Sequence, residues 1–179
     1  MFHLFGHRAE LCYCLASMAF EIRAAQGTCD IEIVQELWNE YWATLGLAPQ
    51  FQSFADELRN LPGAYGEAGG RLMIARAGEE AAGTIALRRL SHVSCEVKRL
   101  YVRPKFRGQG LGRALLNSLI ASSCSIGYVT MYADSLPSMD GAQALYQSCG
   151  FTQVGPYSPA PTDGAVYFEL LLSQTAPAT

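Results

Sequence analysis

Three alternating glycines between a strand-like run and a helix-like run constrain this chain more than any other feature. The segment LYVRPKFRGQGLGRALL, residues 100–116, contains Gly108, Gly110 and Gly112. Glycine adopts backbone conformations that a side chain forbids, and it lets a ligand approach the main chain closely. The first turn of a helix offers unpaired N–H groups and the positive end of the helix dipole. With Arg107 and Arg113 beside it, this turn predicts a binding site for a pyrophosphate.

Two common phosphate motifs do not fit the turn. A dinucleotide site requires G-x-G-x-x-G, and Arg113 occupies the place of the third glycine. A P-loop continues with Lys and then Ser or Thr, where this chain has Arg113 and Ala114. A plain connection between a strand and a helix needs only one glycine, so the three glycines favour anion binding.

The hydrophobic periodicity predicts one α/β domain with a mixed sheet. Strands are predicted over 20–24, 71–77, 81–90, 94–102, 128–133, 151–154 and 166–172, and helices over 30–45, 51–61, 111–122 and 139–148. Asp30 is expected to cap the first helix, and Gly46 to end it. We expect the folded domain to span residues 18–173, with an N-terminal extension at 1–17 and a flexible tail at 174–179.

Composition and charge narrow the classes of partner. The chain has 179 residues, a formal net charge of −3 and 50% hydrophobic residues, without a basic stripe that would suggest nucleic acid. The apolar run near the N-terminus is too short to span a bilayer, so no membrane association is expected. The six cysteines form no CxxC pair, which argues against a metal site and favours a reducing, cytoplasmic setting.

Two motifs resemble the GNAT superfamily of N-acetyltransferases. The segment RGQGLG, residues 107–112, resembles the family's Q/R-x-x-G-x-G/A signature, which holds the pyrophosphate of acetyl-CoA. The segment ALYQSCGF, residues 144–151, resembles its A-L-Y-x-x-x-G-F segment. The spacing of the motifs and the order of elements also match, so the resemblance covers nearly the whole chain apart from its ends. It implies the single-domain GNAT fold, in which helices flank a mixed, mostly antiparallel central sheet whose strands splay at the acetyl-CoA site.

The same resemblance implies an activity and a set of donor contacts. Acetyl-CoA is the expected acyl donor, and its acetyl group passes directly to an amine without a covalent enzyme intermediate or a metal. The main chain near residues 100–102 would bond the pantetheine arm and the thioester oxygen, and the glycine turn would hold the phosphates. The expected cofactor-binding residues are Leu100, Tyr101, Val102, Arg107, Gly108, Gln109, Gly110, Leu111, Gly112 and Arg113. Lys105 is a further candidate for the nucleotide's outer phosphate.

Two side chains are candidates for the proton transfers. Glu96 lies where histone-acetylating relatives carry a general-base glutamate, at the same interval from the glycine motif. Its alternative role is an ion pair with Lys98, which points to the same face of an unbroken strand. Tyr146 matches the family's tyrosine beside the sulfur, where a phenol would protonate the departing thiolate. Its alternative role is that of a core tyrosine.

The resemblance places the acceptor cleft between the first two helices and the last hairpin. The aromatic candidates there are Trp38, Tyr41, Trp42, Phe51, Tyr65, Tyr157 and Tyr167. They favour a small, partly apolar primary amine as the acceptor of a monomeric or homodimeric enzyme. A peptide or protein amine is the alternative acceptor, and a non-catalytic acyl-CoA-binding protein is the alternative to an enzyme. Asp134 stands where many relatives have an asparagine, and turn capping is its expected role.

Overall fold

The computed structural model describes residues 19–46, 54–158 and 161–172. Seven strands form one sheet in the order β1-β2-β3-β4-β5-β7-β6, in which only the β4–β5 pair is parallel. The strands are β1 (Phe20–Ala24), β2 (Arg71–Ala77), β3 (Glu80–Arg89), β4 (Ser94–Val102), β5 (Thr130–Ser135), β6 (Thr152–Val154) and β7 (Val166–Leu171). The helices are α1 (Gly27–Leu45), α2 (Phe54–Arg59), α3 (Gly63–Gly66), the 3-10 turn η2 (Pro104–Phe106), α4 (Leu111–Ile126) and α5 (Asp140–Ser148).

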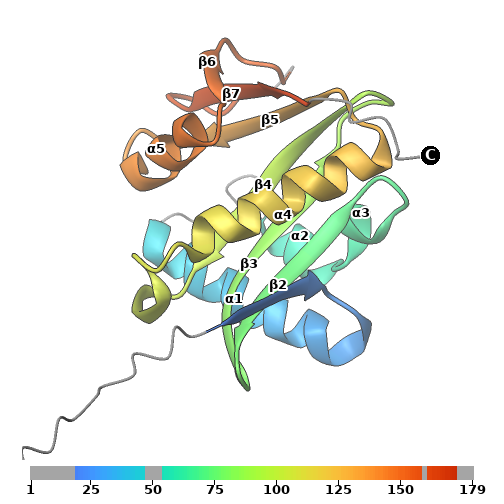
Figure 1. The fold of residues 1–179 in the computed structure, drawn as a ribbon, viewed down its shortest axis with the longest axis vertical. Coiled ribbons are helices and arrows are strands. Elements are labelled where there is room, and N and C mark those ends of the chain that lie inside the picture. The colour runs from blue at the N-terminus through green and yellow to red at the C-terminus, as the bar shows by residue number, and fades with distance from the viewer. Residues whose placement is uncertain (1–18, 47–53, 159–160, 173–179) are drawn as a thin grey trace, which may run out of the picture.

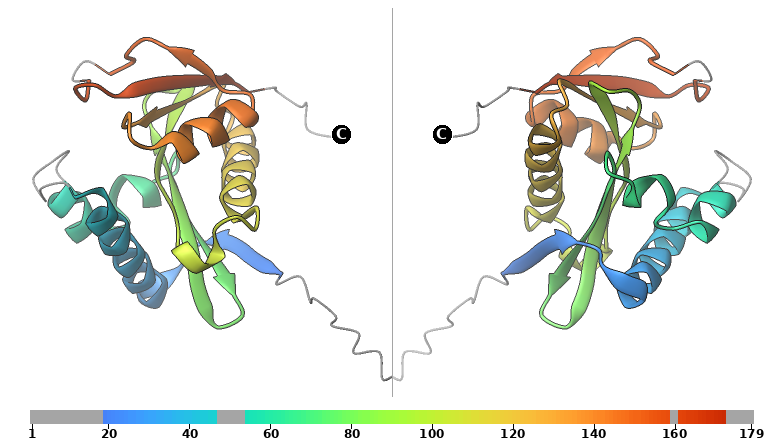
Figure 2. Two further views of the ribbon diagram at one scale, coloured as in Figure 1. Left: turned by 90° about the vertical axis from the view of Figure 1, so that its left-hand side faces the viewer. Right: turned by 90° about the vertical axis from the view of Figure 1, so that its right-hand side faces the viewer.

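The sheet separates two hydrophobic layers. Helices α1, α2 and α3 cover one face, and α4 and α5 cover the other (Figure 1, Figure 2). Neighbouring residues of β2 show why: Ile74 packs with the α1 side chains Val34 and Trp38, whereas Ala75 packs with the α4 side chain Leu115. Successive side chains of a strand point to opposite faces, so a central strand needs apolar residues at nearly every position. The predicted mixed and mostly antiparallel sheet flanked by helices is confirmed.

Most elements lie where the hydrophobic pattern predicts them, and the largest differences are at helix ends. Helix α1 begins at Gly27 rather than at Asp30. Asp30 stabilises that start from inside the first turn, because its carboxylate accepts the backbone N–H of Gln26 at 2.7 Å. Helix α4 continues beyond the predicted residue 122 to Ile126 and ends where Gly127 adopts a φ of 100°. The short helix α3 was not predicted.

Strand β4 contains a bulge that matters for the site. Its residues Lys98 and Tyr101 face Ala86 and Thr84 of β3, so Arg99 and Leu100 together stand opposite one β3 residue. Arg99 has a φ of 55°, in the left-handed region that a non-glycine residue rarely enters. A bulge of this kind bends the strand. On its other side, β4 pairs with β5 only through its residues Ser94 to Val97. The two strands separate beyond this pairing, as expected for the splay.

The two ends of the chain are not covered by this description. The expected extension at residues 1–17 and the expected tail at 174–179 lie outside the described residues, so the domain limits 18 and 173 remain a prediction. Phe51, one of the aromatic candidates for the acceptor cleft, also lies outside them. Within the described ranges, no helix combines the length and the apolar character needed to cross a membrane.

Candidate functional site

The glycine turn has the backbone conformation that its sequence predicts. Gly108 and Gly110 have φ values of 73° and 81°, and a Cβ atom built on either residue would meet no atom within 4 Å. The open space beside them leaves their main chain accessible to a ligand. A Cβ atom at Gly112 would lie 3.5 Å from the Leu145 side chain, which is an ordinary packing contact. The turn therefore needs glycine for its backbone at Gly108 and Gly110, whereas a Cβ atom at Gly112 would fit against α5.

The start of helix α4 supplies the anion-binding groups. Gly110 is the N-cap residue, and its carbonyl oxygen accepts the N–H of Ala114 at 3.0 Å. The preceding amides of the first turn have no carbonyl partner within the helix. No acidic side chain occupies this turn. The positive end of the helix dipole and these amides fit a pyrophosphate at this position.

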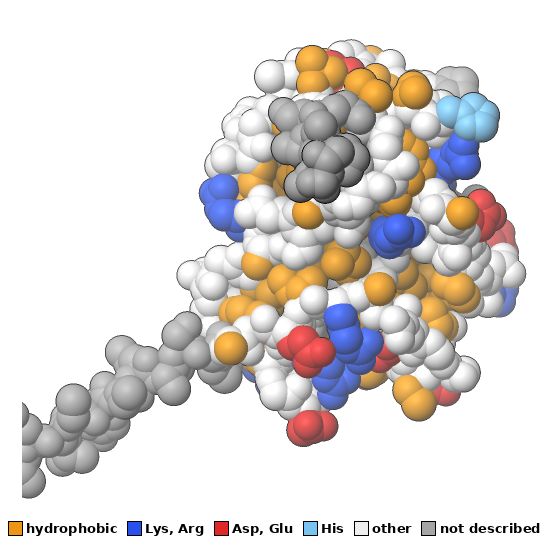
Figure 3. Space-filling view, turned by 45° about the vertical axis from the view of Figure 1, so that its right-hand side comes forward, with side chains coloured by type: hydrophobic (Ala, Val, Ile, Leu, Met, Phe, Trp, Pro, Cys, Tyr) orange, Lys and Arg blue, Asp and Glu red, His pale blue; other side chains and the backbone are white. Residues whose placement is uncertain are grey.

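Three basic side chains surround the turn, each with a protein partner. The exposed Arg107 donates from Nε to the carbonyl oxygen of Val102 at 2.9 Å. Arg113 donates to the Ser148 hydroxyl at 2.9 Å, which fixes it against the end of α5. Lys105 pairs with Glu80. Figure 3 shows one face of the molecule, on which side chains of both charges are likewise neighbours. Arg107 and Arg113 keep N–H groups free for phosphate, since a guanidinium has five.

A narrow cavity of about 50 Å³ lies where β4 and β5 separate. It is lined by Tyr41, Trp42, Leu45, Val97, Lys98, Arg99, Leu100, Asp134, Ser135, Leu136, Met139, Ala142 and Tyr146. The predicted proton donor Tyr146 is therefore at this cavity, although it is 4% exposed and also packs against Phe151 and Phe168. Burial raises the pKa of the Tyr146 phenol, so the phenol holds its proton and can only donate it at neutral pH.

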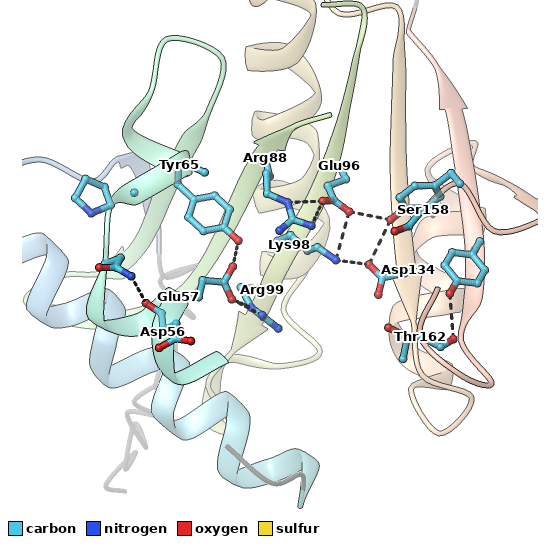
Figure 4. A pocket seen from close by; sticks show the side chains of 16 residues that line it. Asp56, Glu57, Tyr65, Arg88, Glu96, Lys98, Arg99, Asp134, Ser158 and Thr162 are labelled. Atoms are coloured by element: carbon cyan, nitrogen blue, oxygen red, sulfur yellow. Dashed lines mark hydrogen bonds and ion pairs between the residues drawn. The ribbon is translucent and has the colours of Figure 1, made fainter. Parts of the chain in front are cut away.

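A larger cavity of about 450 Å³ opens beside the narrow one, and Figure 4 shows its charged lining. It is lined by Asp56, Glu57, Asn60, Pro62, Gly63, Ala64, Tyr65, Arg88, Glu96, Lys98, Arg99, Asp134, Tyr157, Ser158, Thr162 and Tyr167. Three residues, Lys98, Arg99 and Asp134, line both cavities. We call this shared border the junction. A group held in one cavity can reach a group held in the other only there.

Glu96 belongs to a set of linked polar side chains on the sheet, which we call the charged ring (Figure 4). Its carboxylate is 2% exposed and pairs with Arg88, with Lys98 at 3.3 Å and with the Tyr157 hydroxyl at 3.0 Å. Lys98 also bonds Asp134 at 2.7 Å, and Tyr157 lies 3.4 Å from that same carboxylate. Burial and the two carboxylates raise the pKa of Tyr157, so its hydroxyl remains a donor.

The ring contains both expected and unexpected partners of Glu96. The predicted contact with Lys98 is present, but Arg88 is closer, because it faces Glu96 in the β3–β4 register. An antiparallel pairing of the predicted strands 81–90 and 94–102 would have placed the two residues opposite each other. Asp134 was expected to cap a turn, but its carboxylate pairs with Lys98. The lysine thus neutralises the charge that an asparagine in this position would not carry.

A second cluster holds the β4 bulge. The Arg99 guanidinium donates to Glu57 of α2 at 2.9 Å and lies 5.4–5.8 Å from the ring centres of Trp38, Trp42 and Phe54. Tyr65 of α3 donates to the same carboxylate. Trp38 is fully buried in this cluster and lines neither cavity, in contrast to its predicted place in the acceptor cleft.

The remaining aromatic candidates divide between the two cavities. Tyr65, Tyr157 and Tyr167 line the larger one, and Tyr41 and Trp42 the narrow one. The larger cavity thus combines tyrosines with charged groups of both signs and is not mainly apolar. Among the described residues, no group of three or more His, Cys, Asp or Glu side chains could hold a metal ion.

Comparisons with known proteins agree with this geometry. The family model described as the acetyltransferase (GNAT) domain matches residues 68–153. An uncharacterized N-acetyltransferase of Schizosaccharomyces pombe is 36% identical over 147 residues, which cover 81% of this chain and 90% of that protein. A GNAT-family acetyltransferase from Staphylococcus aureus has a similar structure, with a TM-score of 0.74 at 21% identity over 87% of this chain and 100% of the other. A putative acetyltransferase from Salmonella typhimurium with its cofactor acetyl-CoA has a TM-score of 0.64 at 23% identity, over 89% and 98% of the two chains.

Proposed function

Because this chain belongs to the GNAT family of acetyltransferases, we propose that it moves the acetyl group of acetyl-CoA directly to the primary amine of a small molecule. The observation that carries this proposal is the junction, where the narrow cavity between β4 and β5 meets the larger one. The larger cavity has the volume of a small-molecule site, at about 450 Å³. A peptide or protein amine is the alternative acceptor.

The donor side is proposed to consist largely of main-chain groups. The amides from Gly108 to Arg113 would bind the pyrophosphate, with Arg107 and Arg113 neutralising its charge. The edge of β4 from Leu100 to Val102 has no partner in β5, so its main-chain groups are available to bond the pantetheine arm like an added strand. Acetyl-CoA supplies the activated acetyl group at the narrow cavity.

Glu96 is proposed to accept a proton from the amine. An ammonium with a pKa near 10 has no free electron pair and cannot attack a thioester. The Glu96 carboxylate lines the larger cavity next to the junction residue Lys98, and its hydrogen bonds to Lys98 and Tyr157 hold it in place. Its alternative role is purely structural, as the centre of the charged ring.

Glu96→Gln distinguishes these two roles. If Glu96 is the base, kcat should fall about 10²-fold, the usual range for a lost general base. The deficit should be largest at low pH, because there nearly all of the amine arrives protonated. Asp134→Asn is the matched control, since it removes the other carboxylate bound by Lys98. Equal deficits in both variants, or a deficit independent of pH, would assign Glu96 a structural role.

Tyr146 is proposed to protonate the leaving thiolate. Tyr146→Phe keeps the ring that packs against Phe151 and Phe168 and removes only the hydroxyl at the narrow cavity. We expect kcat to fall roughly tenfold or more while the Kd for acetyl-CoA stays nearly constant, because the hydroxyl acts only when the thiolate departs. Steady-state kinetics and calorimetry measure the two quantities. A change confined to KM would indicate a packing role.

The proposed activity is tested by two measurements on the full chain. Release of the CoA thiol is followed over a panel of amines and short peptides, and acetyl-CoA binding is followed by titration calorimetry. Turnover with small amines at a higher kcat/KM than with peptides is expected. Turnover with peptides alone would favour the alternative acceptor. Tight binding of acetyl-CoA without turnover on any amine would instead identify a non-catalytic acyl-CoA-binding protein.

A further inference from the structure

We propose that the acceptor carries a carboxylate in addition to its amine, and that Arg88 binds this carboxylate in the larger cavity, away from the junction. The inference rests on the proposed function, because it takes the larger cavity as the acceptor site. It assigns the acceptor to the amino acids whose amine and carboxylate are several bonds apart. Three features of the cavity support it. Arg88 is separated from the junction, Arg88 has unused N–H donors, and the other two cations are largely buried.

The junction determines where the amine must lie. Lys98, Arg99 and Asp134 are the residues that border both cavities, so an amine can meet an acetyl group from the narrow cavity only beside them. The reacting end of the acceptor is therefore the end at β5.

Arg88 lies away from the junction. It lines the larger cavity and not the narrow one, and it is on β3, whereas Asp134 is on β5. Strand β4 lies between them in the sheet. Neighbouring strands are about 5 Å apart, so the two residues are separated by about 10 Å across the sheet. An acceptor that reaches both residues needs a chain of several atoms between its amine and its second polar group.

The chemistry of Arg88 suits a carboxylate as that second group. Its Nε and Nη2 both bond a single oxygen of Glu96, Oε1. A guanidinium has five N–H donors, so within the described part of the chain the Nη1 edge is left without an acceptor. Its side chain is 44% exposed, which leaves that edge accessible. Paired N–H donors in a plane match the two oxygens of a carboxylate.

The other two cations of the cavity are already occupied. Lys98 is 13% exposed and lies between the carboxylates of Glu96 and Asp134. Arg99 is 7% exposed, pairs with Glu57 and is enclosed by three aromatic rings. Both are therefore largely buried and already neutralised by carboxylates. Arg88, at 44%, is the most exposed of these three cations and presents unused donors to the cavity.

The test compares matched acceptors with matched variants. We expect kcat/KM for 6-aminohexanoate to exceed that for 6-aminohexanamide by about tenfold or more, because a charge-assisted bidentate pair replaces a neutral contact. Arg88→Gln should abolish this acid-over-amide preference. Arg89→Gln should retain it, since the neighbouring Arg89 is exposed, outside the cavity, and bonded to the Ser91 carbonyl. Arg88→Gln could also lower activity by disturbing Glu96. Such a loss would lower kcat/KM for both acceptors equally, so the ratio of the two kcat/KM values would not change.

Failure of this inference differs from failure of the proposed function. Turnover of both compounds at equal kcat/KM, or an unchanged preference in Arg88→Gln, overturns the role of Arg88 while the acetyltransfer to small amines stands. Absence of turnover with every amine overturns the proposed function. In that case titration of 6-aminohexanoate into the CoA-bound protein decides the inference: binding that Arg88→Gln abolishes supports it, and no binding, or equal binding in both proteins, overturns it.

Discussion

Gly110→Val is expected to weaken acetyl-CoA binding by about 10³-fold or more. The valine side chain would project into the open space beside the first turn of α4, where the pyrophosphate is proposed to bind. Two or three hydrogen bonds to a charged group would be lost, each contributing about 1.5–3 kcal/mol, and about 4 kcal/mol corresponds to a 10³-fold change in Kd. Titration calorimetry with acetyl-CoA measures the effect directly.

Gly127→Val controls for the backbone strain of this substitution. Gly127 lies at the opposite end of the same helix, with a φ of 100°, and a Cβ atom there would also meet nothing within 4 Å. Both variants force a β-branched residue into the left-handed region, so both should lose stability in thermal unfolding. Only Gly110→Val should lose binding. Normal affinity in that variant would mean that the glycine turn is merely a connection between β4 and α4.

Arg99→Met is expected to lower the free energy of unfolding by about 3 kcal/mol or more. The substitution removes the buried cation from the Glu57 carboxylate, which is itself 17% exposed, and breaking one partner of a buried pair typically costs about 3–5 kcal/mol. It also removes the contacts of the guanidinium with Trp38, Trp42 and Phe54. Methionine retains most of the apolar volume of the side chain. The decrease in the free energy of unfolding therefore measures the effect of removing the charge. Urea denaturation measures it.

Arg59→Met provides the comparison within the neighbouring helix. Arg59 pairs with Asp56 on α2, but both side chains are largely exposed, at 71% and 65%. Solvent screens such a pair, and its removal should change the free energy of unfolding by less than about 1 kcal/mol. Equal effects of the two substitutions would contradict the view that the bulge in β4 is held by a desolvated arginine.

The conformation of the glycine turn was predictable because its determinants are local. A positive φ at Gly108 and Gly110 and the start of α4 depend on a few consecutive residues, and the spacing to the segment around Tyr146 supported the family resemblance. The separation of β4 from β5 was also expected from that resemblance. In contrast, the bulge at Arg99 has no signal in the sequence, since its left-handed backbone is occupied by an arginine rather than by a glycine.

The lining of the larger cavity depended on contacts between distant segments. Lys98 and Asp134 are 36 positions apart, and Arg99 and Glu57 are 42 apart, so their pairing follows from how β4 meets β5 and α2. Trp38 illustrates the same limit: helical periodicity placed it on an apolar stripe, and only packing decided that the stripe faces the core and not a cavity.

The sequence by itself determined the alternation of strands and helices, the glycine turn and the family, because periodicity and backbone preference act over a few neighbouring residues. The tertiary structure alone decided the partners of Glu96, the burial of Arg99 and the charged lining of the larger cavity. The physical reason is that ion pairs and burial depend on distance in space. The order of strands in the sheet and the β4 bulge set those distances, which no local pattern records.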